Sequence, residues 1–500
     1  IRKGKLRGLE SCGMFCSGEE LGITDDWYEG ASVHGILIFR EDLPLGESVK
    51  DILAIDDVIF DVNVTANRPD CQSVLGMARE VAAVLGKPLK MPDLSYNTDA
   101  GVSTLKTVKI TDDAFDLCPR YKGRLIKDVK IGPSPEWMRR RLFSMGLKSI
   151  NNVVDITNFV LLEIGQPMHA FDLRDLKGNE INVRRAKKGE KIITLDEKEF
   201  KLDENNLVIC DAEKPVALAG VMGGLNSGIK DDTKDVLFES ARFARDNIRK
   251  TSRTLGQRSD SSARFEKGVD YLSQEIGLKR ALNLVDKLGC GKIACDEYDL
   301  KGEQFKEKTI ETTVDKINGV LGLDIAADTV KNILERLDFK VTLDGRNITV
   351  IVPLYREDVE GYPDLAEEVI REYGYDNITP TLLKTSAITA GGRNAEQKSA
   401  EDLKDLLIGY GYNETITYSF VSEKEFDLFG LDKSRLIRIL NPISEDMAVM
   451  RTTLIPSLVR AAVYNINRQN HDGKLFELAK TYFTVSGGNA ELPEEKEVLC

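Results

Sequence analysis

Apolar and polar positions alternate with two different periods along this chain, and the change of period divides it into segments. Short stretches rich in apolar residues predict β-strands at residues 34–39, 58–64, 107–110 and 121–126. A helical period covers residues 73–85 and ends before a glycine, which is typical of a helix C-terminus. The mixture of expected strands and helices predicts an α+β chain.

Residues 105–300 are predicted to form one compact α+β domain. Ser134 and Pro135 are typical of the N-cap and the first position of a helix, which we expect to end at Gly146. The remaining elements expected in this domain are helices within 150–164 and at 242–254 and 272–288, and strands at 180–183, 191–194 and 207–210.

Residues 305–381 are predicted to form a small separate domain. A strand at 308–313 and two helices precede a hairpin, in which Asp344 and Gly345 supply the turn. Helices followed by a hairpin indicate a winged-helix-like module. That fold often binds DNA, but a fold alone does not establish a function.

The pattern changes again in the last part of the chain. A helix at 400–410, alternating strands at 414–420 and 474–483 and a strand at 436–440 predict an α/β domain with antiparallel strands. This domain is expected to be incomplete. The predicted division of the chain is 1–52, a β-rich piece; 53–104, a linker; 105–300; 305–381; and 390–500.

Composition narrows the class of protein. A chain of 500 residues is too long for one core, and a net charge of −13 argues against a general nucleic-acid binder. The sequence has eight scattered cysteines without a Cys-x-x-Cys pair and three histidines, so zinc is not expected. We find no signal peptide and no apolar run of about 18 residues, and we expect a cytoplasmic, reduced protein without a membrane partner.

Three short segments predict a small-molecule pocket in the domain at 105–300. His169 follows Pro167 in a turn-like segment, and residues 219–224 carry little side chain, so a ligand could approach their backbone. Glu239 lies in a strand pattern in which it shares a face with Leu237. Each segment alone is also compatible with a purely structural role.

Four carboxylates predict a cation site within 305–381. Asp364, Glu367 and Glu368 are spaced to share one face of a helix, and Asp358 lies on the preceding loop. Oxygen ligands of this kind suit magnesium. The alternative is that acidic residues in a first helical turn are favoured by the helix dipole and by capping.

Basic residues gather in two stretches of this acidic chain. Residues 241–270 contain eight basic residues against four acids, and residues 120–148 include Arg139, Arg140 and Arg141 in a row. Such patches can bind a phosphate backbone, although a solvated helix face is the simpler reading.

Several motifs, taken together and in order, resemble the β subunits of bacterial phenylalanyl-tRNA synthetases over essentially the whole chain. They are the segments 63–71 (NVTANRPDC), 165–172 (GQPMHAFD), 217–224 (ALAGVMGG), 264–268 (RFEKG) and 352–358 (VPLYRED). The resemblance implies a multidomain α+β chain with an OB-fold remnant at 1–52, an α+β editing domain, the winged-helix-like domain and an antiparallel class II synthetase-like α/β domain.

The resemblance also implies partners and site residues. In that family the β subunit pairs with an α subunit as (αβ)2, and the α subunit uses ATP and phenylalanine to charge tRNA(Phe). The editing domain hydrolyses mischarged tyrosyl-tRNA(Phe). Residues that match the family's sites are His169, Glu239, Asn158, Ala219 and Gly220 in the editing pocket, and Asp358, Asp364, Glu367 and Glu368 as magnesium ligands shared with the α subunit. The segment 450–452 resembles a degraded form of class II motif 2, and no counterpart of the family's anticodon-binding domain occurs before Cys500.

The chemistry of editing gives these residues expected roles. A hydrophobic synthetic site rejects an added hydroxyl only weakly, so a second, hydrolytic site is needed. We expect Glu239 to accept a hydrogen bond from the phenol of tyrosine, and His169 and Asn158 to orient the ester and a water. Bulk at Ala219 should block the site. The basic residues at 242–254 and around Arg139 become candidate contacts to the tRNA backbone.

Three other interpretations stay open. A winged-helix DNA-binding protein would need a positive helix near 327–338, which is instead mixed in charge. A structural subunit with an inactive pocket would keep the same residues for packing. A free-standing deacylase would not need the domains after residue 300.

Overall fold

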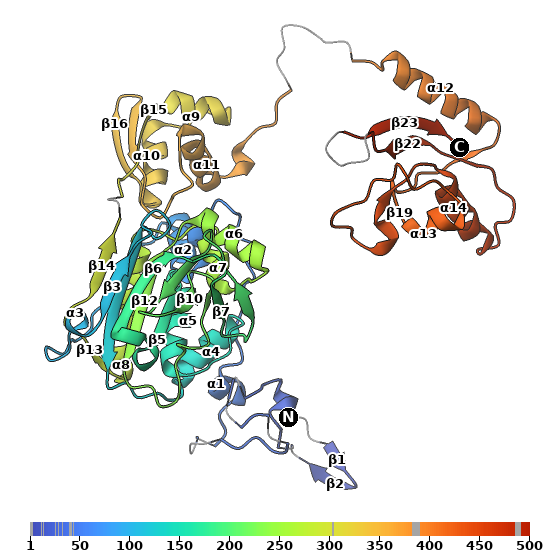
Figure 1. The fold of residues 1–500 in the computed structure, drawn as a ribbon. Helices are drawn as coiled ribbons and strands as arrows, with labels where there is room; N and C mark the ends of the chain where they lie inside the picture. The colour runs from blue at the N-terminus through green and yellow to red at the C-terminus, as the bar shows by residue number, and fades with distance from the viewer. Residues whose placement is uncertain are drawn as a thin grey trace. The chain divides into compact units, whose positions relative to one another are not determined.

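The computed structural model describes the chain except residues 1–3, 12, 14, 26, 29, 33, 40–42, 44, 303–304, 383–390 and 486–491. The chain forms two compact units, residues 1–380 and 381–500, whose labelled elements are shown in Figure 1. Across the described residues, every helix is too short or too polar to span a lipid bilayer.

The described part of the first 65 residues contains little regular structure. The described elements are a hairpin of β1 (Gly4–Leu6) and β2 (Leu9–Ser11), the 3-10 helix η1 (Glu19–Leu21) and α1 (Val49–Leu53). The strands expected at 34–39 and 58–64 are wrong, because these residues pair with no described strand and most of their apolar side chains are exposed. The linker then forms η2 (Pro69–Gln72) and α2 (Val74–Leu85), and Gly86 ends α2 in a left-handed conformation as expected.

Two five-stranded sheets form the centre of the larger unit. One has the order β11-β10-β9-β6-β3, and the other has the order β13-β4-β12-β5 with β14 also paired to β4. The strands are β3 (Lys109–Asp112), β4 (Arg120–Lys127), β5 (Met168–Asp172), β6 (Glu180–Arg185), β9 (Leu207–Cys210), β10 (Pro215–Leu218), β11 (Met222–Gly223), β12 (Val236–Arg242), β13 (Lys292–Ile293) and β14 (Tyr298–Lys301).

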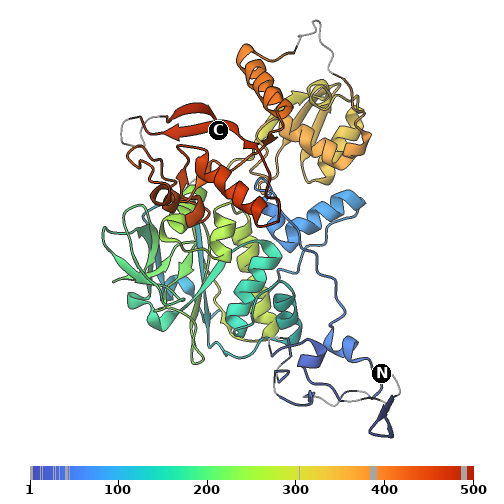
Figure 2. The same ribbon diagram turned by 90° about the vertical axis from the view of Figure 1, so that its right-hand side faces the viewer.

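The side-chain periodicity of the strands gives the second sheet two buried faces. Tyr121, Phe171 and Leu237 from the second sheet share one core with Ile181 and Val208 from the first, so the two sheets pack face to face. The next residues along the same strands point the other way, into a core with three helices. These helices are α4 (Glu136–Ser144), α5 (Asn152–Ile164) and α8 (Ser273–Leu288), which Figure 2 shows in teal to yellow-green beside the strands.

Local capping explains where these helices begin and end. Asn151 accepts hydrogen bonds from the first turn of α5, and Gly289 ends α8 in a left-handed conformation. The expected N-cap at Ser134 is wrong: Pro135 occupies that position, and the Ser134 hydroxyl donates instead to the buried carboxylate of Asp155 at 2.6 Å. Buried polar groups must find partners, and this one finds it in the next helix.

Residues 309–373 pack around a third core, to which α2 contributes Ala83. Strands β15 (Thr309–Thr313), β16 (Lys340–Asp344) and β17 (Asn347–Ile351) form an antiparallel sheet of order β15-β17-β16, with α9 (Val314–Leu321), α10 (Ala327–Arg336) and α11 (Tyr362–Tyr373). Gly345 has φ +63° in the hairpin turn, which explains the glycine there. The order of two helices and a hairpin agrees with the expectation, and the winged-helix class stays a prediction.

The smaller unit has short, scattered strands. Its elements are α12 (Ala395–Gly409), β18 (Asn413–Glu414), β19 (Phe420–Val421), α13 (Glu423–Leu428), β20 (Val449–Met450), α14 (Ile455–Ile466), β21 (Leu475–Phe476), β22 (Leu478–Phe483) and β23 (Glu494–Leu499). The long strand expected at 414–420 is formed only at its two ends, and residues 436–440 contribute one bridge. Pairing is antiparallel for β19–β20 and β22–β23, but parallel for β18–β21.

Candidate functional site

His169 and Glu239 lie directly opposite each other in the second sheet. The antiparallel register of β5 and β12 pairs Glu239 with His169 and Leu237 with Phe171. Because Leu237 and Phe171 point into the core between the sheets, the imidazole and the carboxylate point toward the same side. His169 therefore belongs to a strand, and the expectation of a loop position is wrong.

A pocket opens beside this pair. Its walls come from β5, β9, β10, β11 and β12, from the residue after β12 and from the helix α7 (Asp260–Phe265). The lining residues are Pro167, Met168, His169, Ile209, Ala217, Leu218, Gly220, Val221, Met222, Gly223, Glu239, Phe243, Ser261 and Phe265. Apart from His169, Glu239 and Ser261, these residues offer only apolar or backbone surface to a ligand.

Two glycines of the pocket wall are required by different structural constraints. Gly220 has φ +66°, and a Cβ there would lie 2.8 Å from Phe243 and 3.0 Å from Phe265. Gly223 is under no such conformational demand, but a Cβ there would lie 2.4 Å from Cε1 of His169. The absence of a side chain at Gly223 therefore leaves the space that the imidazole occupies.

The His169 imidazole is neutral and lacks a partner on one nitrogen. Its Nε2 is shielded from solvent and has no hydrogen-bond partner among the described residues. Burial lowers the pKa of His169 to about 4, so the ring carries no charge at neutral pH. The ring packs edge-on against Phe171, with 4.4 Å between the centroids. A buried polar atom without a partner is rare, and Nε2 is placed to bond with a ligand or a water.

Glu239 is a buried carboxylate with one hydrogen bond. The phenol of Tyr121, on the neighbouring strand β4, donates to its Oε2 at 2.7 Å. Burial raises the pKa of Glu239 to about 7, and the hydrogen bond from Tyr121 opposes this rise. The side chain is 6% exposed and lines the pocket, so its ionisation responds to what the pocket contains.

Two of the residues expected at this site are not among those that line it. Ala219 is fully buried in the core between the sheets, so added bulk there would disturb packing before it blocked a ligand. Asn158 lies on α5, whose buried side chains pack against the other face of the sheet. The structure thus brings together His169, Glu239 and Gly220, but not Asn158 or Ala219.

Sequence patterns missed four residues of this site. Tyr121 was recognised only as part of a strand, and Phe243, Ser261 and Phe265 carried no signal of a pocket. Phe243 follows β12 after Arg242, and Phe265 packs against it with 5.0 Å between the ring centroids. Nε2 of His169 accepts no hydrogen bond from Ser261, so the two do not form a nucleophile–base pair.

The four carboxylates expected to bind magnesium are not gathered in this chain. The one cluster of possible ligands among the described residues is Asp70, Cys71 and Glu80, whose acids are ion-paired to Arg68. Glu368 is 1% exposed and accepts hydrogen bonds from Arg356 at 2.8 Å, and Arg356 also binds Asp358 at 2.9 Å.

The two other acids also have different surroundings. Asp364 accepts hydrogen bonds from two backbone N–H groups at the start of α11, which is the capping role considered as the alternative, and Glu367 is exposed. Burial would raise the pKa of Glu368, but Arg356 and Arg371 lower it to about 2. Because arginines already balance two of the four charges, these residues alone do not fit a magnesium site.

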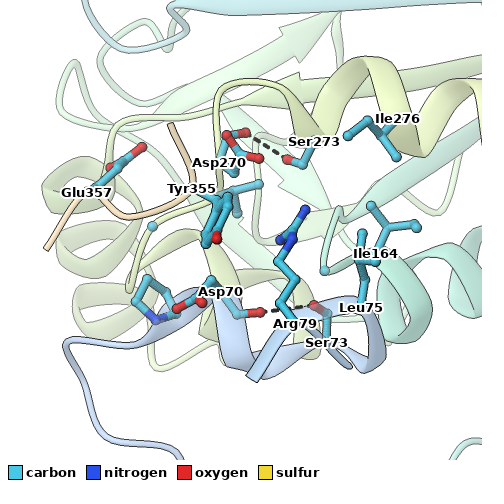
Figure 3. A pocket seen from close by; sticks show the side chains of 14 residues that line it. Asp70, Ser73, Leu75, Arg79, Ile164, Asp270, Ser273, Ile276, Tyr355 and Glu357 are labelled. Carbon is cyan, nitrogen blue, oxygen red and sulfur yellow. Dashed lines mark hydrogen bonds between the residues drawn. The ribbon is translucent and has the colours of Figure 1, made fainter. Parts of the chain in front are cut away.

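A second pocket lies where the linker meets residues 268–276 and 355–357. Figure 3 shows Arg79 extending into it beside Tyr355, with the guanidinium carbon 4.1 Å from the ring centroid. Two of the acids that line it are ion-paired outside it, Asp70 with Arg68 and Glu357 with Arg242. None of the residues expected in the candidate sites lines this pocket.

The two basic stretches differ in what their charges contact. On α6 (Arg245–Leu255), Arg245, Arg249 and Arg253 are exposed, follow one face and make no salt bridge among the described residues. In the other stretch, Arg139 and Arg140 donate to the backbone carbonyls of Asp25 and Ile52, so they hold the N-terminal segment. On β4, Arg120, Lys122 and Arg124 are buried beside Glu297 and Asp299. Of the two described stretches, the face of α6 is the one that presents a cationic surface of the expected kind.

Arg451, in the segment expected to resemble a class II motif, has a structural position. It is 3% exposed, and its guanidinium binds Glu477 and the hydroxyl of Thr417, both at 2.9 Å. Its charge is thus satisfied inside the smaller unit.

Family models match three regions of the chain. A B3/4 domain matches residues 117–290, which hold the pocket, and a tRNA synthetase B5 domain matches residues 310–375. A phenylalanyl tRNA synthetase beta chain CLM domain matches residues 378–500. Together the three models place the chain among the subunits of aminoacyl-tRNA synthetases.

Curated relatives give the particular family. The phenylalanine–tRNA ligase beta subunit of Syntrophus aciditrophicus is 44% identical over 100% of this chain and 62% of its own length. That of Clostridium tetani is 42% identical over 100% of this chain and 63% of its own length. The chain belongs to the family of phenylalanine–tRNA ligase beta subunits, and it spans somewhat less than two thirds of these relatives.

A solved structure gives a weaker likeness. An N-terminal fragment of the phenylalanyl-tRNA synthetase beta subunit from Pyrococcus horikoshii covers 62% of this chain and 85% of its own, with 19% identity and a TM-score of 0.32. A score this low does not establish a shared fold.

Proposed function

We propose that the chain is part of the beta subunit of a phenylalanine–tRNA ligase that works in the cytoplasm. In this proposal it pairs with an alpha subunit as (αβ)2, and the alpha subunit binds ATP and phenylalanine and charges tRNA(Phe). Membership of the beta-subunit family supports this assignment. No step is assigned to magnesium, because Arg356 already balances two of the expected ligands.

We further propose that the pocket at His169 and Glu239 hydrolyses tyrosyl-tRNA(Phe). The observation that carries this proposal is the pairing of an uncharged imidazole and a buried carboxylate across β5 and β12, beside an apolar wall. The apolar wall suits an aromatic side chain, and the carboxylate suits the single hydroxyl that distinguishes tyrosine from phenylalanine.

Selectivity follows from the cost of leaving the second oxygen of Glu239, which Tyr121 does not bind, without a donor. The tyrosine phenol can donate to this carboxylate, whereas phenylalanine would exclude water from it and offer nothing in return. A buried acceptor left unpaired costs about 1–3 kcal/mol, and more when it is charged. That difference corresponds to a preference of about ten- to a hundredfold for the tyrosyl ester.

Hydrolysis needs a positioned water rather than a protein nucleophile. The water oxygen attacks the ester carbonyl carbon, the bond from that carbon to the terminal tRNA oxygen breaks, and a water proton ends on the released tRNA hydroxyl. A neutral His169 can accept a hydrogen bond from the water at Nε2, which has no described protein partner. With a pKa of about 4 the imidazole is a weak base, so its contribution is to orient the water.

Replacing Gly223 with alanine tests whether the imidazole must stay where it is. The added Cβ would lie 2.4 Å from Cε1 of His169 and would displace the ring. Misplacement of about 1 Å can cost about a hundredfold in rate. We expect Gly223→Ala to reduce the hydrolysis of tyrosyl-tRNA(Phe) by about ten- to a hundredfold, measured as release of tRNA from the radiolabelled ester.

Gly132→Ala is the matched control for this experiment. It is in the same domain, and a Cβ there meets no atom within 4 Å, so we expect hydrolysis at the wild-type rate. Equal rates in Gly223→Ala and Gly132→Ala would contradict the pocket assignment. Absence of hydrolysis in the wild-type enzyme would instead favour a structural subunit with an inactive pocket.

The exposed face of α6 is proposed to contact the tRNA backbone. The helix begins shortly after Phe243, a wall of the pocket, and Arg249 and Arg253 are exposed without salt bridges among the described residues. Reversing both charges with Arg249→Glu and Arg253→Glu should weaken tRNA binding. It should also reduce the slope of log Kd against log salt by about one for each phosphate that the helix no longer binds.

Lys130→Glu with Lys234→Glu is the control for this charge reversal. Both lysines are exposed, and they lie at the far end of β12 from α6, where Val129 N–H donates to the carbonyl of Lys234 at 2.7 Å. The control changes net charge by the same amount. If it lowers the salt slope as much as the α6 variant does, the contact is not local to α6.

A further inference from the structure

Tyr121 reaches the carboxylate of Glu239 from the strand opposite to His169. The register of β4 and β12 pairs Glu239 with Gly123 and Ala241 with Tyr121, so the phenol approaches diagonally. A Cβ at Gly123 would lie 2.4 Å from Cδ1 of Ile110, so packing excludes a side chain from the position that faces Glu239. Tyr121 is fully buried, and its hydroxyl is 2.7 Å from Oε2.

This contact leaves the two carboxylate oxygens in different states. Oε2 accepts the hydrogen bond from Tyr121. Oε1 has no hydrogen-bond donor among the described residues, and it is not shielded from solvent. Since Glu239 lines the pocket, Oε1 is the oxygen that remains for a ligand.

We propose that Tyr121 is a specificity-determining positioning residue, which holds Oε2 of Glu239 and leaves Oε1 to accept the hydroxyl of a phenolic ligand. This inference rests on the proposed editing function. The protein itself supplies one phenol to the carboxylate, and the tyrosyl group of the substrate supplies the second. Each oxygen then has one donor, which is the arrangement that buried carboxylates require.

The charged and titratable groups around Glu239 make Tyr121 important for its ionisation. On the side of β4 stand Tyr121 and Cys118, Asp112 ends β3, and His169 faces Glu239 from β5. At neutral pH none of these groups is a cation, because burial lowers the pKa of His169 and the other three side chains never carry a positive charge. Burial also raises the pKa of the Cys118 thiol and of the Tyr121 phenol, so both stay neutral. The walls from β9, β10 and α7 add no ionisable side chain to the pocket. Among the described groups around the pocket, the phenol of Tyr121 is thus the one that stabilises the ionised form of Glu239.

The direction of the pH effect follows from these contacts. Burial raises the pKa of Glu239 to about 7. Above this pH the side chain is a charged carboxylate, which is costly to bury without a hydrogen-bond donor. Below this pH it is a neutral acid, which is less costly to bury beside the ring of phenylalanine. Selectivity for the tyrosyl ester should therefore rise as pH rises through about 7. Loss of the Tyr121 hydroxyl should move that rise upward by about one to two pH units, the worth of a hydrogen bond to a charged group.

The experiment compares Tyr121→Phe with Tyr298→Phe in the assembled enzyme. Tyr298 pairs with Gly123 from the other side of β4, and its hydroxyl donates to the backbone carbonyl of Val108 at 3.0 Å, so it is a matched phenol without contact to Glu239. The ratio of kcat/KM for tyrosyl-tRNA(Phe) over phenylalanyl-tRNA(Phe) is measured from pH 6 to 9, with uncatalysed ester hydrolysis subtracted. We expect the upward shift in Tyr121→Phe alone. The same profile in Tyr121→Phe and the wild type would overturn the proposal.

A second measurement separates this inference from the editing function. The carboxyl stretching band of Glu239, identified as the infrared band absent from Glu239→Gln, is titrated without any RNA. Its midpoint should rise in Tyr121→Phe, and it should fall when 3,5-difluorotyrosine, a stronger donor, is incorporated at position 121. Midpoints that do not move overturn the role of Tyr121. Failure of the wild type to hydrolyse either ester, with midpoints that do move, overturns the editing function instead.

Discussion

Replacing Glu239 with glutamine is expected to lower the ratio of tyrosyl-tRNA(Phe) to phenylalanyl-tRNA(Phe) hydrolysis by about ten- to a hundredfold. Glutamine keeps the shape of the side chain, and its amide oxygen can still accept the hydrogen bond from Tyr121 at Oε2. The change removes the negative charge beside the pocket. A neutral amide is a weaker acceptor for the tyrosine hydroxyl, and it is less costly to bury beside a bare phenyl ring.

The two esters should therefore respond differently to this substitution. Hydrolysis of tyrosyl-tRNA(Phe) should slow, and hydrolysis of phenylalanyl-tRNA(Phe) should stay level or increase. Single-turnover rates at pH 8, where the wild-type carboxylate is ionised, measure both directly, since Glu239 has a pKa of about 7. Equal slowing of both esters would mean that Glu239 holds the ester end or the fold rather than reading the hydroxyl.

Replacing Arg356 with methionine is expected to destabilise residues 309–373 by about 3–5 kcal/mol. Arg356 and Glu368 are 2% and 1% exposed, and the guanidinium binds both carboxylate oxygens at 2.8 Å. Removing the arginine leaves a buried carboxylate with only Arg371 as a charged partner. Adding Glu368→Met to the first substitution removes that charge and should restore most of the lost stability.

Hydrogen exchange of the β15–β17 amides reports the stability of this region within the whole chain. Arg346→Met is the control: Arg346 pairs with Asp315 at the surface of the same region, where both side chains are about half exposed or more, and such a pair is worth about 1 kcal/mol or less. Protection that falls equally in Arg346→Met and Arg356→Met would contradict a special role for the buried pair.

Lowering the pH should also destabilise this region. Glu368 has its pKa lowered to about 2, so its contribution is present above about pH 4.5 and is lost as pH falls toward 2.

The side of the sheet on which a side chain lies could be predicted from the sequence of its own strand. Alternation over residues 236–239 placed Glu239 on the same side as Leu237, and the structure shows both on the side of the sheet that faces the other sheet. The glycine-rich segment at 219–224 was correctly expected beside the imidazole, and Gly223 shows why. These are local properties, because a side chain's direction follows from its own strand.

Contacts between distant strands could not be predicted in this way. The Tyr121 phenol and Glu239 are 118 positions apart, and only the register of β4 and β12 brings them together. Ala219 was expected to line the pocket because the resemblance matched it to the family's editing site. Ala219 lies in the turn after β10, where Gly220 has φ +66°, and its side chain is buried in the core between the sheets.

The acidic helix shows a similar limit of spacing rules. Positions 364, 367 and 368 share a broad helical face, but adjacent residues are about 100° apart around the axis, so Glu368 can be buried while Glu367 is exposed. The sequence showed the acids and also Arg356, but not that this arginine would turn inward and neutralise two of them.

Calorimetric binding of two non-hydrolysable analogues tests the central claim most directly. The ligands are 3′-deoxyadenosines that carry tyrosine or phenylalanine through a 3′-amide, titrated into the assembled wild-type enzyme and into Glu239→Gln at pH 8. We predict that the wild type binds the tyrosyl analogue about ten- to a hundredfold more tightly and that Glu239→Gln loses this preference. Equal affinity of the wild type for the two analogues would contradict a pocket that distinguishes a phenol from a phenyl ring.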